Sequence, residues 1–119
     1  MKAYTDIEQS KKLAKILPIE SVDMYYAYYH NPISGASYYE EYPMLYKPIC
    51  NPNESVPCWS LATLYGVLPL VDFTTPQLIG TPKTLYRCMY NDDLKSHAYD
   101  NPVDACYEMI IRLHELNLL

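Results

Sequence analysis

Basic residues are scarce in this sequence. Nine Lys and Arg stand against 14 Asp and Glu, which gives a formal net charge of −5. Because phosphate contacts from Lys and Arg supply most of the affinity of proteins for nucleic acids, this balance argues against DNA or RNA as a partner. Glycine is scarce too, and Gly35, Gly66 and Gly80 stand too far apart to form a phosphate-binding or dinucleotide-binding loop. We expect no cofactor.

Long uncharged runs are also missing. The longest, from Ser55 to Val71, contains Pro57 and Pro69 and is too short and too broken to cross a bilayer. The opening residues, 1–12, lack the apolar segment of a signal peptide. We therefore expect a cytoplasmic protein, away from membranes, with reduced thiols.

The four cysteines form no CxxC pair. Zinc sites use ligands in closely spaced pairs, whereas the cysteines and histidines here are all spaced singly. We therefore expect no metal site, and we expect free, mostly buried thiols that behave as small apolar residues. The cysteines are Cys50, Cys58, Cys88 and Cys106.

Tyrosine is the residue in excess. The chain has 14 tyrosines but only one Phe and one Trp. Since tyrosine joins an apolar ring to a polar tip, this usage indicates half-buried surfaces or interfaces. The length of 119 residues predicts a single globular domain over 1–119.

The first predicted element is a helix that runs up to Pro18. Thr5 and Glu8 have the spacing of a capping box, and the residues after them alternate between an apolar and a lysine-rich face. Two strands follow, Asp23–Tyr29 and Tyr38–Tyr46, with a turn at Asn31 between them, so that they form a hairpin.

The middle of the chain predicts a buried helix over Pro57–Leu68, which is apolar nearly all round and serves as the central core helix. The segment Leu70–Lys83 is rich in proline and glycine and predicts a long irregular connection, a type of loop that often carries function. A second hairpin is predicted from Thr84–Tyr90 and Leu94–Tyr99, turning at residues 91–93.

The last predicted helix begins at Asn101. Asn101 is the N-cap, Pro102 occupies the first helical position and Asp104 the third, where its charge suits the helix dipole. The apolar arc of this helix is wider than one sheet face needs, so we expect it to pack on two partners, one of which could be a second copy of the chain. The predicted fold is α+β and two-layered, an antiparallel sheet of about four strands with three helices in the order α-β-β-α-β-β-α.

Alternation along the first strand divides its tyrosines between two faces. Tyr26 and Tyr28 point one way, and Tyr25 and Tyr29 the other. Only one face can meet the helices of a two-layer domain, so the other is exposed, covered by a protein partner, or stacked on a ligand. Tyrosine is enriched in protein interfaces, which favours a protein partner or self-association. The candidate binding residues are Tyr25, Tyr26, Tyr28, Tyr29, Tyr38 and Tyr39.

One segment could carry cysteine chemistry. A thiol in the first turn of a helix is activated by the dipole, and Cys58 would hold that position in the predicted helix. Cys58-Trp59-Ser60 resembles the nucleophile segment of papain-like proteases, which implies His97 as base and Asp100 or Asn101 as the residue that orients it. The glutamine that the family has six residues before its cysteine is Pro52 here, and the glycine beside the nucleophile is missing.

Two longer segments, Asn53–Pro69 and Asp100–Leu119, resemble a group of small uncharacterised proteins of gut anaerobic bacteria, often encoded in phage-like or mobile regions. This resemblance implies a bacterial or phage accessory protein and no particular activity. Our expectation is therefore a non-enzymatic protein-interaction module with a tyrosine-rich face. A small-ligand or carbohydrate binder that uses the tyrosine face with the Leu70–Lys83 loop is the first alternative, and a cysteine-dependent enzyme with Cys58 as nucleophile is the second.

Overall fold

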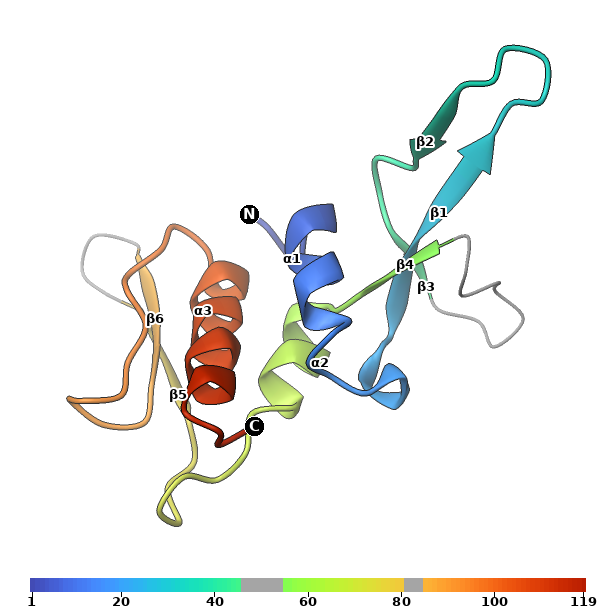
Figure 1. The fold of residues 1–119 in the computed structure, drawn as a ribbon. Helices are drawn as coiled ribbons and strands as arrows, with labels where there is room; N and C mark the ends of the chain where they lie inside the picture. The colour runs from blue at the N-terminus through green and yellow to red at the C-terminus, as the bar shows by residue number, and fades with distance from the viewer. Residues whose placement is uncertain (46–54, 81–84) are drawn as a thin grey trace. The chain divides into compact units, whose positions relative to one another are not determined.

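The computed structural model describes residues 1–45, 55–80 and 85–119. It confirms the predicted α+β class, with three helices, a four-stranded antiparallel sheet and a separate two-stranded hairpin (Figure 1). The helices are α1 (Ile7–Leu13), α2 (Leu61–Gly66) and α3 (Pro102–Glu115), with a short 3-10 turn η1 (Ile19–Ser21). The strands are β1 (Met24–His30), β2 (Ser37–Tyr39), β3 (Met44–Leu45), β4 (Ser55–Cys58), β5 (Gln77–Gly80) and β6 (Tyr86–Met89).

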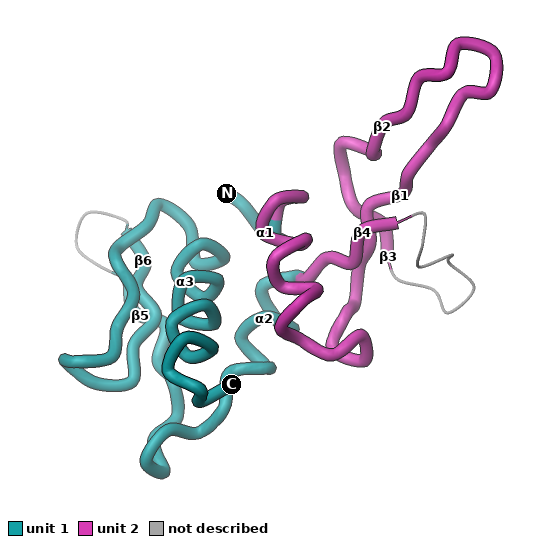
Figure 2. The backbone as a smooth tube through the Cα atoms, viewed as in Figure 1, with its two compact units in different colours: residues 1–5, 60–119 teal, residues 6–59 magenta. Residues whose placement is uncertain are grey.

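The chain folds into two compact units (Figure 2). Unit 2 is continuous and spans Asp6–Trp59, with α1 and the four-stranded sheet. Unit 1 combines the first five residues with Ser60–Leu119 and holds α2, α3 and the β5–β6 hairpin. In unit 1 the two segments are joined where Leu61 N–H donates to the Ala3 carbonyl. The single domain over 1–119 stays a prediction.

Helix α1 begins one residue later than its sequence predicted. Asp6, not Thr5, is the N-cap, and Gln9, not Glu8, completes the capping box. The Asp6 carboxylate accepts from Gln9 N–H at 2.8 Å, and the Gln9 amide oxygen accepts from Asp6 N–H at 3.1 Å. The residue types and spacing of a capping box are thus present twice, shifted by one residue, and Asp6 with Gln9 forms the cap. The helix ends at Leu13, five positions before Pro18, and the chain closes with tighter turns.

Strand β1 is the centre of the sheet in unit 2. Its second half pairs with β2, and its first half pairs with β3 and β4, all antiparallel. Since Met24 and Tyr25 pair with β3 and with β4, these two strands flank β1 on opposite edges. The predicted β1–β2 hairpin is confirmed, and its turn is held by the Asn31 carboxamide, which accepts from Ile33 N–H. The predicted strand Tyr38–Tyr46 is wrong in extent, because residues 40–43, which end in Pro43, separate β2 from β3.

The predicted helix over Pro57–Leu68 is also wrong in its first third. Ser55–Cys58 is strand β4, and Pro57 lies opposite Tyr25 of β1. The helix begins only after Ser60, whose hydroxyl accepts from Thr63 N–H as the N-cap. This segment is a strand because it pairs with β1, a distant part of the chain, and the local sequence does not show that pairing. The prediction of an all-round buried helix is wrong too, since Leu64 is buried while Ala62 and Tyr65 are exposed.

The hairpin of unit 1 pairs differently from the prediction. β6 pairs with β5, and β5 occupies the end of the segment predicted to be irregular, Leu70–Lys83, whose residues 81–83 lie outside the described part. The predicted partner, Leu94–Tyr99, instead forms isolated bridges with β6 at Met89–Lys95 and Tyr86–Tyr99. The predicted turn at residues 91–93 is confirmed, and the Asn91 side chain accepts from Asp93 and Leu94 N–H.

Helix α3 confirms the predicted start. The Asn101 side chain accepts from Asp104 N–H at 2.8 Å, and Pro102 occupies the first helical turn. The helix packs against both β6 and α2, so its wide apolar arc has two partners within unit 1 and needs no second copy of the chain. The core of unit 1 is built from Leu64, Leu68, Cys88, Tyr90, Val103, Ala105, Cys106, Met109, Ile110 and Leu113.

Candidate functional site

The tyrosine run of β1 is divided between two faces of the sheet, as its alternation predicts. In an antiparallel pair, residues directly opposite share a face, so the register extends each face to the neighbouring strands. Tyr28 lies opposite Tyr39, and Tyr29 lies opposite Tyr38. The ring centroids of the first pair are 5.1 Å apart and those of the second 5.5 Å apart. Four of the six candidate tyrosines therefore form two contacting pairs, one on each face.

The inner face is the one that α1 covers. Tyr26 is 3% exposed, and Val56 opposite it on β4 is also buried. The Lys11 ammonium of α1 lies 5.2 Å from the centre of the Tyr39 ring, a cation–π contact that ties the helix to β2. Tyr26 is therefore a core residue of unit 2, and its ring packs in the core instead of forming an exposed binding surface.

The outer face carries the tyrosines that the core does not use. We define the outer tyrosine face as Tyr25, Tyr29, Tyr38 and Met44. Tyr29 is 43% exposed and Tyr38 56% exposed. Met44, which sequence reasoning did not single out, joins them because it lies opposite Tyr25, with its sulfur 3.8 Å from the Tyr25 hydroxyl. The sequence does not show which residue after Pro43 lies opposite Tyr25. Only the pairing of β3 with β1 shows that this residue is Met44.

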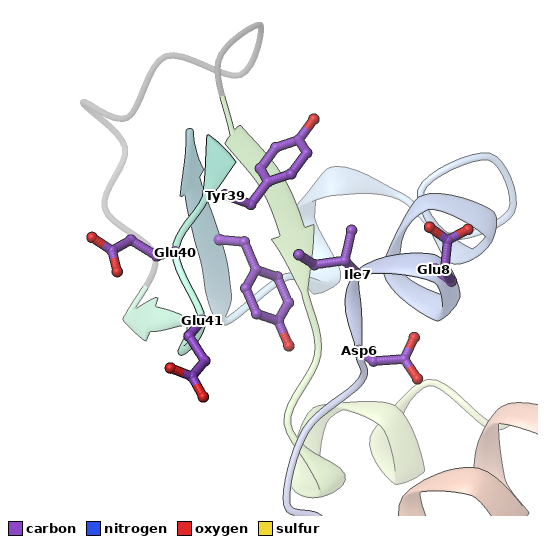
Figure 3. A pocket seen from close by; sticks show the side chains of 7 residues that line it. Asp6, Ile7, Glu8, Tyr39, Glu40 and Glu41 are labelled. Carbon is purple, nitrogen blue, oxygen red and sulfur yellow. The ribbon is translucent and has the colours of Figure 1, made fainter. Parts of the chain in front are cut away.

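A hollow of about 400 Å³ lies where α1 meets the sheet edge (Figure 3). Its apolar part comes from Ile7 and the rings of Tyr26 and Tyr39. In Figure 3, Asp6 and Glu8 extend from the helix side and Glu40 and Glu41 from the sheet side. Four of the residues that line this hollow therefore carry carboxylates, which makes this part of unit 2 acidic. The complete lining is Asp6, Ile7, Glu8, Tyr26, Tyr39, Glu40 and Glu41.

The charged residues in the stretch of sequence that contains the tyrosine hairpin are all acidic. Between Lys15 and Lys47 the sequence contains four acids and neither Lys nor Arg. Glu40 directly follows β2, and its backbone N–H donates to the Ala27 carbonyl, which holds it beside the centre of β1. The outer tyrosine face is therefore apolar and aromatic, with carboxylates next to it. The acids of this stretch are Glu20, Asp23, Glu40 and Glu41.

The residues proposed for cysteine chemistry are placed as follows. Cys58 is fully buried in β4 rather than in the first turn of a helix, so the helix dipole does not activate it. His97 is exposed and is bound to Glu108, and the Asp100 carboxylate accepts from the Asn101 side chain at 2.8 Å. Cys58 belongs to unit 2, whereas His97 and Asp100 belong to unit 1.

Glu108 of α3 organises the end of unit 1 that contains His97. Its carboxylate accepts from the His97 backbone N–H at 2.7 Å and from the Tyr99 hydroxyl at 2.9 Å, and it contacts the His97 ring at 2.5 Å. Burial raises the pKa of Glu108, but the hydrogen bonds from His97 and Tyr99 outweigh burial and hold the pKa below its usual value. Burial and the bond to Glu108 in turn raise the pKa of Tyr99.

Cys88 of β6 and Cys106 of α3 share a thiol–thiol hydrogen bond inside unit 1. This bond, together with burial, raises the pKa of the Cys88 thiol far above its usual value. The prediction of buried thiols outside disulfide bonds is confirmed for Cys58, Cys88 and Cys106, and Cys50 lies outside the described residues.

Among the described residues, no three His, Cys, Asp or Glu side chains are grouped so that they could hold a metal ion. No helix in the described ranges has both the length and the apolar character that crossing a membrane requires. The chain matches no family model, and neither the curated proteins nor the solved structures contain a significant match to it.

Proposed function

We propose that this protein is a non-enzymatic interaction module that binds another protein through the outer tyrosine face. The observation that carries the proposal is the exposure of Tyr29 and Tyr38, which contact each other on the side of the sheet away from α1. Tyrosine is among the residues that dominate binding energy in protein interfaces, because its rigid ring buries a large area at a small entropic cost. Met44 adds a flexible apolar side chain to the same surface.

The charges beside this face define the kind of partner that fits. Glu40 and Glu41 follow directly after β2, and no Lys or Arg occurs between Lys15 and Lys47. A partner surface with apolar side chains and at least one Lys or Arg would pair with these carboxylates, whereas an acidic surface or a nucleic acid would be repelled. In line with the resemblance of Asp100–Leu119 to small proteins of gut anaerobes and their phages, we propose that this partner is found in such a bacterium or phage.

Two neighbouring tyrosines provide a matched test. Tyr28 and Tyr29 are adjacent on β1 and 37% and 43% exposed, but they lie on opposite faces. We expect Tyr29→Ser to abolish partner recovery in quantitative affinity purification from the native host, and Tyr28→Ser to retain it. A partner recovered equally well by both variants would overturn the assignment of the outer face. Both proteins are checked for native circular dichroism beforehand.

Self-association is measured in the same set of variants. Size-exclusion chromatography with light scattering is run on the wild type, Tyr28→Ser and Tyr29→Ser over a range of concentrations. A wild-type dimer that only Tyr29→Ser dissociates would identify the partner as a second copy of the chain. A monomer at every concentration, together with the absence of any protein that depends on Tyr29, would contradict the proposed function.

Small-ligand binding is the second candidate, because exposed rings in contact also provide a stacking surface for a sugar. A thermal-shift screen over mono- and oligosaccharides separates the two functions. Stabilisation by a sugar that is lost in Tyr29→Ser and kept in Tyr28→Ser would favour the ligand, and a flat screen would favour the protein partner.

A further inference from the structure

A second hollow, of about 180 Å³, lies in unit 1, and its lining contains more basic than acidic residues. Arg87 projects from β6, Lys95 and His97 from the segment that bridges β6, and Arg112 from α3, which packs beside β6 (Figure 1). Three of the nine Lys and Arg residues of an acidic chain thus converge on one small hollow. Its lining consists of Arg87, Asp93, Lys95, Ser96, His97 and Arg112.

Two of these cations form no ion pair with the residues that the structure describes. The Arg87 Nε is buried and forms no hydrogen bond among the described residues, and the Arg87 guanidinium and the Lys95 ammonium form no ion pair there. Asp93 lines the same hollow without pairing with either of them. A buried guanidinium N–H that is left unsatisfied costs free energy, and an incoming acceptor would recover it.

The remaining polar groups of the hollow are held in place by the fold. The Arg112 Nε lies 3.6 Å from Glu108, which also binds His97. Ser96 is nearly fully buried, and its hydroxyl accepts from Cys88 N–H and donates to the His97 carbonyl. The backbone that carries Lys95, Ser96 and His97 is thereby fixed against β6. The secondary structure therefore fixes the backbone positions from which the cations extend.

We propose that this hollow is a binding site for a tetrahedral oxyanion of the phosphate type. Guanidinium groups bind such oxyanions through paired, charge-assisted hydrogen bonds, and Lys95 adds a point charge. A site needs only about 10–15 Å³ of such space to hold one water molecule, so the hollow has room for a phosphate group. This site is in unit 1 and does not depend on the outer tyrosine face.

The phosphate could be a free ion or part of an organic phosphomonoester. A neighbouring hollow of about 340 Å³ shares Asp93 and Arg112 with the first and is also lined by Leu94, Glu115 and Leu116. These leucines would contact an organic group attached to the phosphate. Phenyl phosphate that binds more tightly than inorganic phosphate would identify an organic phosphomonoester as the ligand, and equal affinity would identify the free ion; either result supports the site.

The test is a calorimetric titration of the full chain with inorganic phosphate, phenyl phosphate and acetate. We expect saturable binding of the two phosphates, tighter than that of acetate. Arg87→Gln and Lys95→Gln should each weaken phosphate binding by roughly ten-fold, the loss typical of one charged hydrogen bond. Lys12→Gln is the matched control, because it removes the same charge from an exposed lysine of α1 in unit 2. It should leave the affinity unchanged.

Three results would overturn the proposal. The first is the lack of saturable phosphate binding by the wild type at millimolar concentration. The second is acetate binding as tight as phosphate binding. The third is an equal loss of affinity in Lys12→Gln and Lys95→Gln, which would indicate unspecific attraction. If Arg87→Gln does not fold, Lys95→Gln decides, since the Lys95 ammonium forms no ion pair within the described residues.

Discussion

Tyr29 of β1 lies directly opposite Tyr38 of β2, and the centroids of their rings are 5.5 Å apart on the face of the sheet that α1 does not cover. One residue earlier, Tyr28 contacts Tyr39 on the other face. A single hairpin therefore carries one aromatic pair towards the helix and one away from it. Strand alternation produces this division, and it separates tyrosines that stabilise unit 2 from tyrosines available for binding.

The two kinds of tyrosine should differ in their effect on stability. Tyr26→Ala removes a buried ring from unit 2 and should lower the free energy of unfolding by about 3 kcal/mol, as large-to-small core substitutions do. Tyr29→Ala removes a ring that is nearly half exposed and should cost about 1 kcal/mol or less, the value of one cross-strand pair. Urea denaturation followed by circular dichroism measures both. Equal losses in the two variants would contradict the assignment of inner and outer faces.

The cap of α3 should be worth more than the cap of α1. Asn101 is nearly buried, and its side chain accepts from Asp104 N–H while its amide donates to Asp100 and Asp104. Asn101→Ala should therefore cost about 2 kcal/mol, the upper end of the range for N-caps. Asp6→Ala, at the exposed start of α1, is the control and should cost about 1 kcal/mol. Thermal unfolding measures the difference, and Asn101→Ser should recover part of the loss.

Glu108 should make unit 1 sensitive to acid. Its pKa in the folded protein lies below the unfolded value, so its ionised form stabilises the fold above the unfolded pKa of about 4.3, and this contribution is lost as pH falls through the lower, folded pKa. Unfolding free energies measured from neutral to acidic pH should therefore fall less steeply in Glu108→Gln than in the wild type. Parallel curves for the two proteins would contradict the role of the His97 and Tyr99 hydrogen bonds.

The described thiols should resist alkylation in the native protein. Cys58, Cys88 and Cys106 are fully buried, and the raised pKa of Cys88 further lowers its thiolate fraction. Iodoacetamide labelling followed by peptide mass spectrometry should find these three unmodified in buffer and modified in urea. Rapid labelling of native Cys58 would instead favour the cysteine-dependent enzyme over the interaction module.

Local signals predicted the parts of the fold that local interactions form. The Asn101-Pro102 start of α3, the turn at Asn91 and the hairpin turn at Asn31 are confirmed, because each depends on side chains bonding to backbone groups within three residues. The N-cap of α1 was misplaced by one residue, and the larger errors fall where pairing with a distant strand decides the structure. Ser55–Cys58 has the proline and apolar residues of a helix start, yet it is a strand because β1 pairs with it.

For the candidate sites, too, the sequence did not show the parts that depend on contacts between elements. The hollow around Arg87 has no sequence signature, because its cations come from β6, from the segment that bridges β6 and from α3. Met44 joins the outer tyrosine face only through its pairing with Tyr25. Contacts between different secondary-structure elements create both sites, and the pattern within one element does not encode such contacts.

For the tyrosine run of β1, the sequence by itself determined that the rings alternate between two faces, since successive side chains of any strand point in opposite directions. It also determined that every Asp, Glu, Lys or Arg between Lys15 and Lys47 is acidic. Only the tertiary structure decided that Tyr26 is buried and Tyr29 exposed. The reason is that burial depends on which face of the sheet α1 covers. The alternation of side chains along β1 does not specify that face, because it follows from the packing of α1 against the sheet.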